Sequence, residues 1–185
     1  MYPSATSQAL ERHRAGPRKD VIWVLSKFKK VVVGGTFDYL HDGHAAILTK
    51  AFELGERVLV GICSDDMQLL LEKDSAGIQL LDLRKRALEE LLRSRGWMER
   101  AEVGVISDAF GPSLKDSELE AIVVSPETQA RAEELNRLRT SKGLKALEIV
   151  EIPFVLAEDG KPISSIRVRY GEIDVHGKLL KQSHL

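Results

Sequence analysis

The segment from Val31 to His44, VVVGGTFDYLHDGH, sets the strongest limit on how this chain can fold. It begins with three consecutive valines, and an unbroken β-branched run is typical of a strand that is buried on both faces. Gly34 and Gly35 follow the run, and after His44 apolar residues recur at helical spacing. A buried strand therefore leads through a glycine turn into a helix. The N–H groups and the positive helix end at this junction favour an anion above the carboxyl end of the strand.

The rest of the chain continues the alternation of strand and helix. We predict strands at residues 31–33, 57–62, 102–106, 121–124 and 146–152, and helices after His44 up to residue 54 and at 67–72, 82–95, 126–141 and 163–170. Five short strands separated by helices predict an α/β fold with a doubly wound, five-stranded parallel sheet and right-handed crossovers. Ligands bind such sheets beyond the carboxyl ends of the strands, where the segments GGTFD, SDD and SPET fall.

The pattern accounts for one domain with an extension at each end. At 185 residues the chain is long enough to bury a substantial core, and its sequence shows no internal repeat and no sign of a second domain. We assign residues 29–177 to the folded domain. Residues 1–28 are interpreted as a basic, loosely ordered N-terminal extension, and residues 178–185 as a C-terminal tail.

Composition excludes several classes of function. Charged residues make up 30% of the chain and nearly cancel, with a net charge of -1, so bulk electrostatics suggests neither a nucleic-acid nor a membrane partner. The single cysteine, Cys63, provides neither a disulfide framework nor a cysteine zinc site. No apolar run approaches the ~20 residues that span a bilayer, and no signal-peptide pattern is visible. We expect a soluble, cytoplasmic protein that acts as a monomer.

His41 and His44 are the candidate functional side chains at the junction. An H-x-x-H pair can bind zinc, but no third ligand stands at a recognised spacing, so we expect no metal there. Packing or surface histidines at a helix start are the alternative interpretation. The glycine turn, Thr36 and Asp38 lie within ten residues of the pair and favour a functional role. The segment has neither the G-K-[ST] ending of a Walker motif nor the dinucleotide-binding pattern G-x-G-x-x-G.

HDGH at residues 41–44 resembles the H-x-G-H signature of the nucleotidylyltransferase superfamily, and the preceding GTFD resembles the turn found there. The resemblance implies a Rossmann-like fold and transfer of a nucleotidyl group, in which negative charge grows at the α-phosphate and on the leaving pyrophosphate. His41 and His44 would contact the nucleotide phosphates, and His44 would stabilise the pentavalent transition state. Thr36 would position the attacking phosphate. The glycines that would let the backbone approach the phosphates are Gly34, Gly35 and Gly43.

A second motif lies far along the chain, at Pro162–Asp174 (PISSIRVRYGEID). It resembles the I-S-S-T-x-x-R motif of the same superfamily, in which a serine-capped helix start binds the triphosphate. Ser164 and Ser165 would supply hydroxyl and N–H donors. Arg167 would supply a positive charge, with Arg169 as its alternative. An isoleucine replaces the threonine of the motif, which removes one hydroxyl contact. Alone, a Ser-Ser pair indicates only a helix cap, but two half-motifs in the right order favour a nucleotide site.

Within the superfamily the chain resembles most closely the archaeal type of phosphopantetheine adenylyltransferase, over roughly residues 31–177. The segments that carry this resemblance are GGTFDYLHDGH, SDDM with Lys73 downstream, Arg84 in the next helix, SPET with Asn136 and Arg139, AEDGKPISS and RYGEID. It implies that Lys73 contacts phosphate during catalysis and that Lys73 and Arg84 bind the acceptor phosphate, with an exposed helix face as the alternative for Arg84. Ser125, Glu127 and Thr128 would line the adenine side of the ATP site, with a helix cap as their alternative.

The implied reaction is adenylyl transfer from ATP to 4′-phosphopantetheine, which gives dephospho-coenzyme A and pyrophosphate. Mg²⁺ would arrive with ATP rather than in a protein cage. Two other classes stay open. One is another H-x-G-H enzyme, such as a nicotinamide mononucleotide or FMN adenylyltransferase or a glycerol-phosphate cytidylyltransferase, although the R-T-x-G-I-S-T ending of the cytidylyltransferases differs from PISSIRVR. The other is a non-catalytic nucleotide sensor on the same fold.

Overall fold

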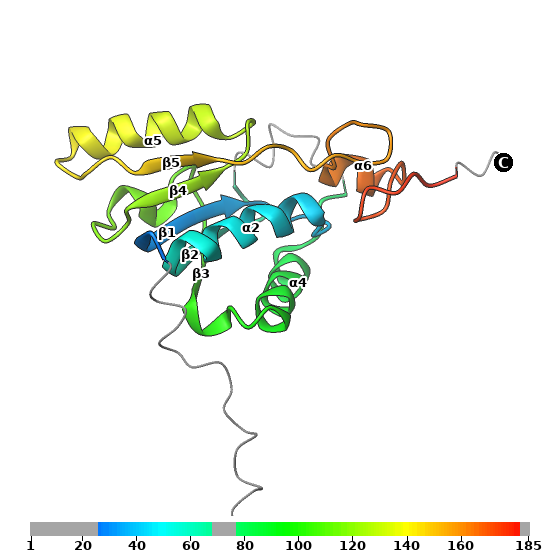
Figure 1. The fold of residues 1–185 in the computed structure, drawn as a ribbon, viewed down its shortest axis with the longest axis horizontal. Coiled ribbons are helices and arrows are strands. Elements are labelled where there is room, and N and C mark those ends of the chain that lie inside the picture. The colour runs from blue at the N-terminus through cyan, green and yellow to red at the C-terminus, as the bar shows by residue number, and fades with distance from the viewer. Residues whose placement is uncertain (1–25, 68–76, 182–185) are drawn as a thin grey trace, which may run out of the picture.

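The structure of the chain, a computed structural model, describes residues 26–67 and 77–181. Almost all of the expected N-terminal extension lies outside these residues, as do Lys73 and most of the helix predicted at residues 67–72. The described part forms a parallel sheet with helices on both of its faces (Figure 1).

Within the described residues the strands and helices alternate as predicted. The strands are β1 (Phe28–Gly35), β2 (Gly55–Cys63), β3 (Ala101–Ile106), β4 (Ala121–Val124) and β5 (Glu148–Glu151). The helices are α2 (Asp42–Leu54), α4 (Leu81–Ser94), α5 (Gln129–Ser141) and the short α6 (Ser165–Arg169), with 3₁₀ turns η1 (Met98–Arg100) and η2 (Gly111–Leu114).

The sheet order is β3-β2-β1-β4-β5, and every neighbouring pair of strands is parallel. This confirms the prediction of a doubly wound α/β sheet. From β1 the chain moves outward through β2 to β3 and then returns to the other side of β1, so the strand order reverses between β1 and β4. Open α/β sheets bind ligands at such a reversal, beyond the carboxyl ends of the strands. Helix α6 lies beyond these strand ends (Figure 1).

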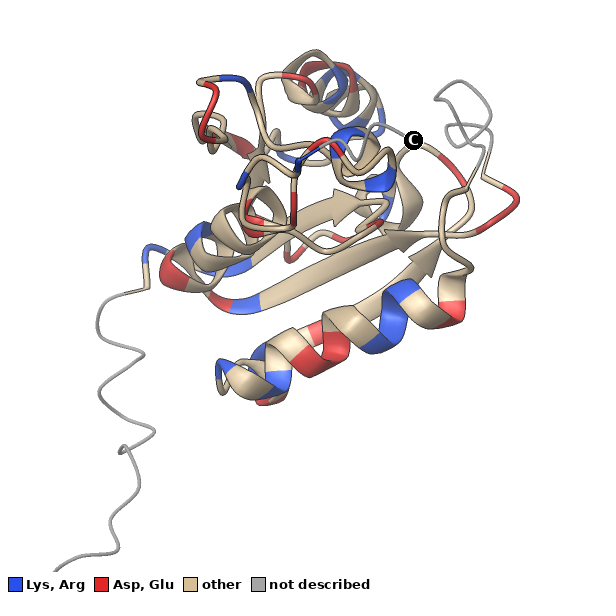
Figure 2. Cartoon of the chain, turned by 90° about the vertical axis from the view of Figure 1, so that its right-hand side faces the viewer, with Lys and Arg blue, Asp and Glu red and all other residues tan. Residues whose placement is uncertain are grey.

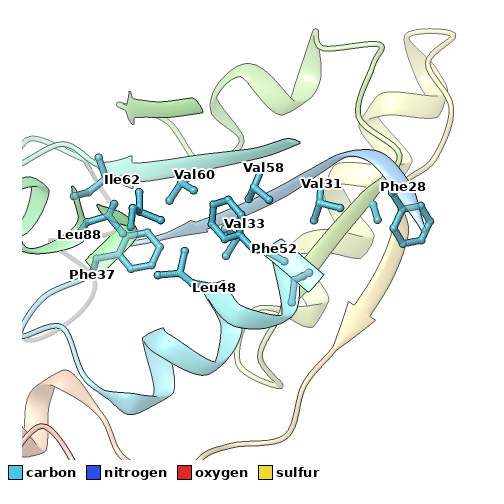
Figure 3. Packing of buried hydrophobic residues seen from close by; sticks show 14 residues of the cluster. Phe28, Val31, Val33, Phe37, Leu48, Phe52, Val58, Val60, Ile62 and Leu88 are labelled. Carbon is cyan, nitrogen blue, oxygen red and sulfur yellow. The ribbon is translucent and has the colours of Figure 1, made fainter. Parts of the chain in front are cut away.

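The valine run of β1 is buried on both faces, as its composition predicts. Val31 and Val33 are fully buried and pack in a cluster with Leu48 of α2 and Leu88 of α4 (Figure 3). Val32 alternates to the other face, where it packs with Leu135 of α5. Helices α2 and α4 therefore cover one face of the sheet and α5 the other, as right-handed crossovers require. The core thus holds β1 at the centre of the sheet with its glycine turn at the ligand-binding edge.

Strand β1 begins at Phe28, earlier than the predicted start at Val31, because the fold accommodates a lysine inside it. Lys30 is only 5% exposed. Its ammonium lies 2.6 Å from a carboxylate oxygen of Glu102 and 2.9 Å from one of Asp116. A lysine is compatible with a buried strand when its charge is paired in this way.

Helix α5 begins at Gln129 rather than at Pro126, where the sequence placed its start. The residues between β4 and α5 form a turn instead. Thr128 Oγ1 accepts a hydrogen bond from Ser125 N at 3.1 Å, and Thr128 N donates to Ser125 O at 3.0 Å. Ser125 and Glu127 are therefore on a loop at the carboxyl end of β4 and not within a helix.

Residues 178–180, which the sequence placed in a tail, are hydrogen-bonded to the domain. Lys178 N donates to Asp174 Oδ1 and Leu179 N to Glu158 Oε2, both at 2.9 Å. Leu180 N donates to the carbonyl of Glu172 at 3.0 Å. This segment closes the loop that follows α6 and so supports the second motif.

Charges of both signs are interspersed along the helices and loops, and the strands of the sheet carry few of them (Figure 2). This distribution agrees with the near-neutral net charge of the chain. Among the residues that the structure describes, no helix combines the length and the apolar character needed to cross a membrane.

Candidate active site

A cavity of about 570 Å³ lies at the carboxyl edge of the sheet, where the strand order reverses. Every predicted ATP-binding residue except Arg167 lines it. These residues are Gly34, Gly35, Thr36, His41, Gly43, His44, Ser125, Glu127, Ser164 and Ser165. Because they come from β1, α2, the β4–α5 loop and the start of α6, the fold brings the two half-motifs of the sequence to one site.

The turn between β1 and α2 has a strained backbone. Phe37 and Tyr39 have φ angles of 53° and 41°, in the left-handed region that residues other than glycine rarely adopt. Each such residue costs on the order of 1–3 kcal/mol and persists only where its surroundings enforce it. Phe37 is 1% exposed and its ring packs against that of His44, with ring centroids 5.3 Å apart. The turn therefore supports the face on which the histidines lie.

His41 and His44 form a stacked pair at the start of α2. His41 is the N-cap residue, and the ring centroids lie 3.9 Å apart with an angle of 25° between the planes. The backbone N–H of His41 donates to His44 Nδ1 at 3.4 Å. A neutral imidazole that accepts at Nδ1 carries its proton on Nε2. His44 thus presents an N–H donor at a helix N-terminus, where phosphate is also favoured by the backbone.

His41 is held in its neutral form. Burial lowers its pKa to about 4, and the neighbouring Asp42 carboxylate offsets this only in part. Its side chain is 8% exposed. At neutral pH the pair therefore offers hydrogen bonds rather than two positive charges, and the positive charge of the site has to come from other residues.

Ser165 connects the second motif to the first. Its hydroxyl donates to the carbonyl of Asp38 at 2.8 Å, and its oxygen lies 3.4 Å from His41 Nε2. Ser164 caps α6, since its hydroxyl accepts from Arg167 N at 3.4 Å. Ser164 therefore provides the helix cap that the sequence predicts, and Ser165 provides the contact between the two motifs.

The arginine that faces the cavity is Arg169 and not Arg167. Arg167 pairs with Asp159 at 2.6 Å and with Glu172 at 3.0 Å, outside the cavity. Arg169 lines the cavity, is largely buried, and places Nη2 3.4 Å from Asp38 Oδ2. The spacing of the I-S-S-T-x-x-R motif was the available signal, because its last position coincides with Arg169.

Arg84 does not line the cavity, so the structure lends no support to its predicted contact with the acceptor phosphate, and the alternative of an exposed helix face is wrong. Its side chain is fully buried and so does not lie on an exposed helix face. Its guanidinium donates to Gln79 O at 2.7 Å and to Thr36 O and Cys63 O at 2.8 Å each. It also pairs with Asp65 at 2.6 Å. Arg84 therefore ties the ends of β1 and β2 together instead of facing the acceptor.

Thr128, which the sequence placed with Ser125 and Glu127 on the adenine side, also lines the cavity. Arg131, in the first turn of α5, is a lining residue that the sequence analysis did not name. Arg131 carried no sequence signal, because a charged residue on a polar helix face usually indicates contact with solvent. Lys73 lies outside the described residues. Within residues 26–67 and 77–181 no group of three or more His, Cys, Asp or Glu side chains is placed to hold a metal ion.

The comparisons with known proteins agree with this geometry. The family model described as Cytidylyltransferase-like matches residues 32–171. The curated phosphopantetheine adenylyltransferase of Methanopyrus kandleri is 46% identical over 150 residues, which cover 81% of this chain and 94% of the relative. That of Pyrococcus abyssi is 43% identical over 85% of this chain and 99% of the relative. The chain belongs to the phosphopantetheine adenylyltransferase family.

Solved structures show the same fold. A protein of unknown function from Archaeoglobus fulgidus has a TM-score of 0.59 at 28% identity, over 68% of this chain and 98% of that one. A bifunctional NMN adenylyltransferase/ADP ribose pyrophosphatase from Francisella tularensis has a TM-score of 0.53 at 13% identity, over 77% of this chain and 41% of that one. The second likeness concerns the fold alone.

Proposed function

We propose that this protein transfers the adenylyl group of ATP to 4′-phosphopantetheine and releases dephospho-coenzyme A and pyrophosphate. The observation that carries the proposal is the meeting of the two half-motifs, with His41 Nε2 and Ser165 Oγ 3.4 Å apart at one cavity. The family of the chain supports the choice of substrates, because relatives named phosphopantetheine adenylyltransferase match more than four-fifths of it.

In the proposed reaction a phosphate oxygen of phosphopantetheine attacks the α-phosphorus of ATP in line. A new P–O bond forms, and the bond from the α-phosphorus to the oxygen that bridges the α- and β-phosphates breaks, so that pyrophosphate leaves with the electron pair. The attacking phosphate is already anionic at neutral pH, and no general base or covalent intermediate is needed. Catalysis consists of positioning, which can lower the barrier by up to ~7–11 kcal/mol, and of stabilising charge.

The residues of the cavity divide these tasks. His44 donates from Nε2 to the α-phosphate as charge grows there, and Thr36 orients the attacking phosphate. Ser164 and Ser165 hold the leaving phosphates, with Arg169 supplying the positive charge that the neutral His41 does not. Ser125, Glu127, Thr128 and Arg131 form the nucleoside side of the cavity. Lys73 keeps its proposed role at the transferred phosphate as a prediction from family resemblance.

Mg²⁺ fits this site as an ion that arrives with ATP. The buried carboxylate of the cavity, Asp38, already accepts from Gln79 N and faces Arg169, so it is committed to the protein. When bound, the ion would neutralise part of the charge of the phosphates. The protein groups that would complement it are the neutral donors of His44 and Ser165 and the cationic Arg169.

We further propose that the protein works in the cytoplasm as a monomer on small molecules, without a nucleic-acid or membrane partner. The near-neutral net charge and the interspersed positive and negative residues along the helices support the absence of a nucleic-acid partner. Light scattering after size-exclusion chromatography tests the monomer, and an equilibrium mass of two chains would contradict it.

Pyrophosphate release separates the proposed function from its alternatives. The purified protein is supplied with ATP or CTP and Mg²⁺, together with phosphopantetheine, glycerol phosphate, FMN or nicotinamide mononucleotide. We expect release only with ATP and phosphopantetheine. Release with another pair would replace the proposed substrates by that pair. ATP binding with no release for any acceptor would favour the nucleotide sensor.

A further inference from the structure

The strained turn of the first motif is held from outside by a residue that does not line the cavity. Gln79 lies 40 residues beyond Tyr39 in the sequence, yet its side-chain oxygen accepts a hydrogen bond from Tyr39 N at 3.0 Å. Its own backbone N–H donates to Asp38 Oδ1 at 2.9 Å. Gln79 therefore makes two hydrogen bonds to the turn, one to Asp38 and one to Tyr39. Tyr39 is the residue with the left-handed φ of 41°.

Gln79 is in turn fixed by Arg84. The carbonyl of Gln79 accepts from Arg84 Nε at 2.7 Å, and Arg84 Nη1 donates to Thr36 O at 2.8 Å. The other strained residue, Phe37, thus stands between Thr36, held by Arg84, and Asp38, held by Gln79. Arg84 is fully buried and also bonded to the end of β2, so it forms a rigid base for this support.

The turn supports both parts of the catalytic constellation. It connects Thr36 to His41, the N-cap of α2 whose ring stacks on His44. The carbonyl of Asp38 accepts the Ser165 hydroxyl, and its carboxylate faces Arg169. A relaxation of the turn toward ordinary backbone angles would therefore displace the histidines and the second motif together.

We propose that Gln79 is a positioning residue for adenylyl transfer, which acts by holding the turn at residues 36–39 in its strained conformation. The kinetic part of this inference rests on the proposed function. Gln79 is not among the residues that line the cavity, so it acts through the turn and not on the substrates. Small displacements of catalytic groups matter here, because a shift of ~1 Å far from the chemistry can lower a rate about 100-fold.

The variants are chosen to remove or to keep the hydrogen-bond acceptor that Gln79 offers to Tyr39 N. The side chain of Gln79 acts on Tyr39 as an acceptor. Gln79→Met keeps the length of the side chain but removes the acceptor, and Gln79→Glu keeps an acceptor oxygen at the same reach. Gln79→Asn withdraws the same amide by one methylene and serves as the milder variant where Gln79→Met does not fold. Gln129→Met is the matched control, because Gln129 is an exposed glutamine that does not line the cavity.

We expect Gln79→Met to lower kcat by about tenfold or more while KM for ATP changes by less than about threefold, since an aligning role leaves ground-state binding largely intact. Gln79→Glu should recover a large part of kcat, and Gln129→Met should match the unaltered protein. A purely structural Gln79 would lower the melting temperature and leave kcat unchanged well below melting. That result would overturn the proposal, as would equal losses of kcat in Gln79→Met and Gln79→Glu.

A second measurement does not depend on which molecule accepts the adenylyl group. In protein labelled with ¹⁵N-histidine, the imidazole signals of His41 and His44 should change in Gln79→Met, return toward their original positions in Gln79→Glu, and stay in place in Gln129→Met. Unchanged signals in Gln79→Met would overturn the proposal even if the unaltered protein transferred no adenylyl group. Inactivity of the unaltered protein with every acceptor would instead contradict the proposed function, so the two failures are distinguishable.

Discussion

His41 Nε2 lies 3.4 Å from the hydroxyl oxygen of Ser165, although 124 residues separate the two in the sequence. Ser165 uses its single proton to donate to Asp38 O, so the ring nitrogen is the donor in this contact. His41 is thereby fixed as the Nε2–H tautomer, and this contact joins the helix start to the second motif. Donors fixed in advance of charge development are the main source of catalysis in reactions of this class.

Replacing His44 by alanine should lower kcat by about 10²–10³-fold, because it removes one preorganised donor at the α-phosphate. The fold should persist, since His44 is only partly buried and lines the cavity rather than the hydrophobic core. Steady-state pyrophosphate release gives kcat, and a thermal melt serves as the control for folding. Turnover close to that of the unaltered protein would exclude the assigned role.

Ser165→Ala should lower kcat on the order of tenfold, since it removes both the contact to His41 and the hydrogen bond that ties α6 to the turn. Ser141→Ala is the matched control. Ser141 is an exposed serine whose hydroxyl donates to a helix carbonyl, that of Leu138, at 2.8 Å. We expect no change of kcat in this control. Equal kinetics of the two variants would show that the meeting of the motifs has no catalytic consequence.

Periodicity and composition were sufficient for the five strands, for the helices that the structure describes and for their order, because these elements depend on burial that the sequence records locally. The valines of β1 predict a buried strand, and the two histidines mark the start of α2. The contact between His41 and Ser165 could be expected only from family resemblance, since no local pattern encodes a distance between segments that far apart. The hydrogen bonds of Gln79 to the turn had no sequence signal for the same reason.

Arg84 illustrates a different limit of prediction from sequence. Family resemblance suggested a substrate ligand, and the charge of Arg84 suggested an exposed helix face. Arg84 nevertheless lies four residues before Leu88 and eight before Leu92 on the buried stripe of α4. The helical spacing therefore indicated burial, while the charge indicated exposure. The structure resolves the conflict by surrounding the guanidinium with carbonyl groups and Asp65, which a sequence pattern cannot reveal.

The two arginines of the second motif should differ in effect. Arg169→Met should lower kcat/KM for ATP by about 10–100-fold, because it removes the positive charge that lines the cavity. Arg169→Lys should be intermediate, since a lysine keeps the charge but not the planar guanidinium. Arg167→Met is the matched comparison and should mainly lower the melting temperature, because Arg167 pairs with Asp159 and Glu172 away from the cavity. The reverse order of kinetic effects would restore Arg167 as the ATP ligand.

The stability of the protein should depend on pH through His41. Burial lowers its pKa in the folded state to about 4, whereas an unfolded chain has a histidine pKa of about 6.5. Between these values the unfolded state binds more protons, so the free energy of unfolding should fall as the pH decreases through this window, by up to about 3 kcal/mol. Desolvation raises the pKa values of Asp65 and Asp116, but hydrogen bonds and neighbouring cations together lower them by more, so both pKa values are lowered. The stability that these carboxylates contribute is therefore lost only below the ordinary aspartate range.

Urea unfolding at pH 7.5, 6 and 4.5 measures this dependence, and His41→Asn is the variant that isolates it. Asparagine keeps a polar group at the N-cap but does not titrate, so the variant should lose much less stability between pH 7.5 and 4.5 than the unaltered protein. The difference between the two slopes is the contribution of His41. Parallel pH profiles would show that His41 titrates normally in the folded state and carries a charge at the phosphates near pH 6, which would reverse its assignment as a neutral donor.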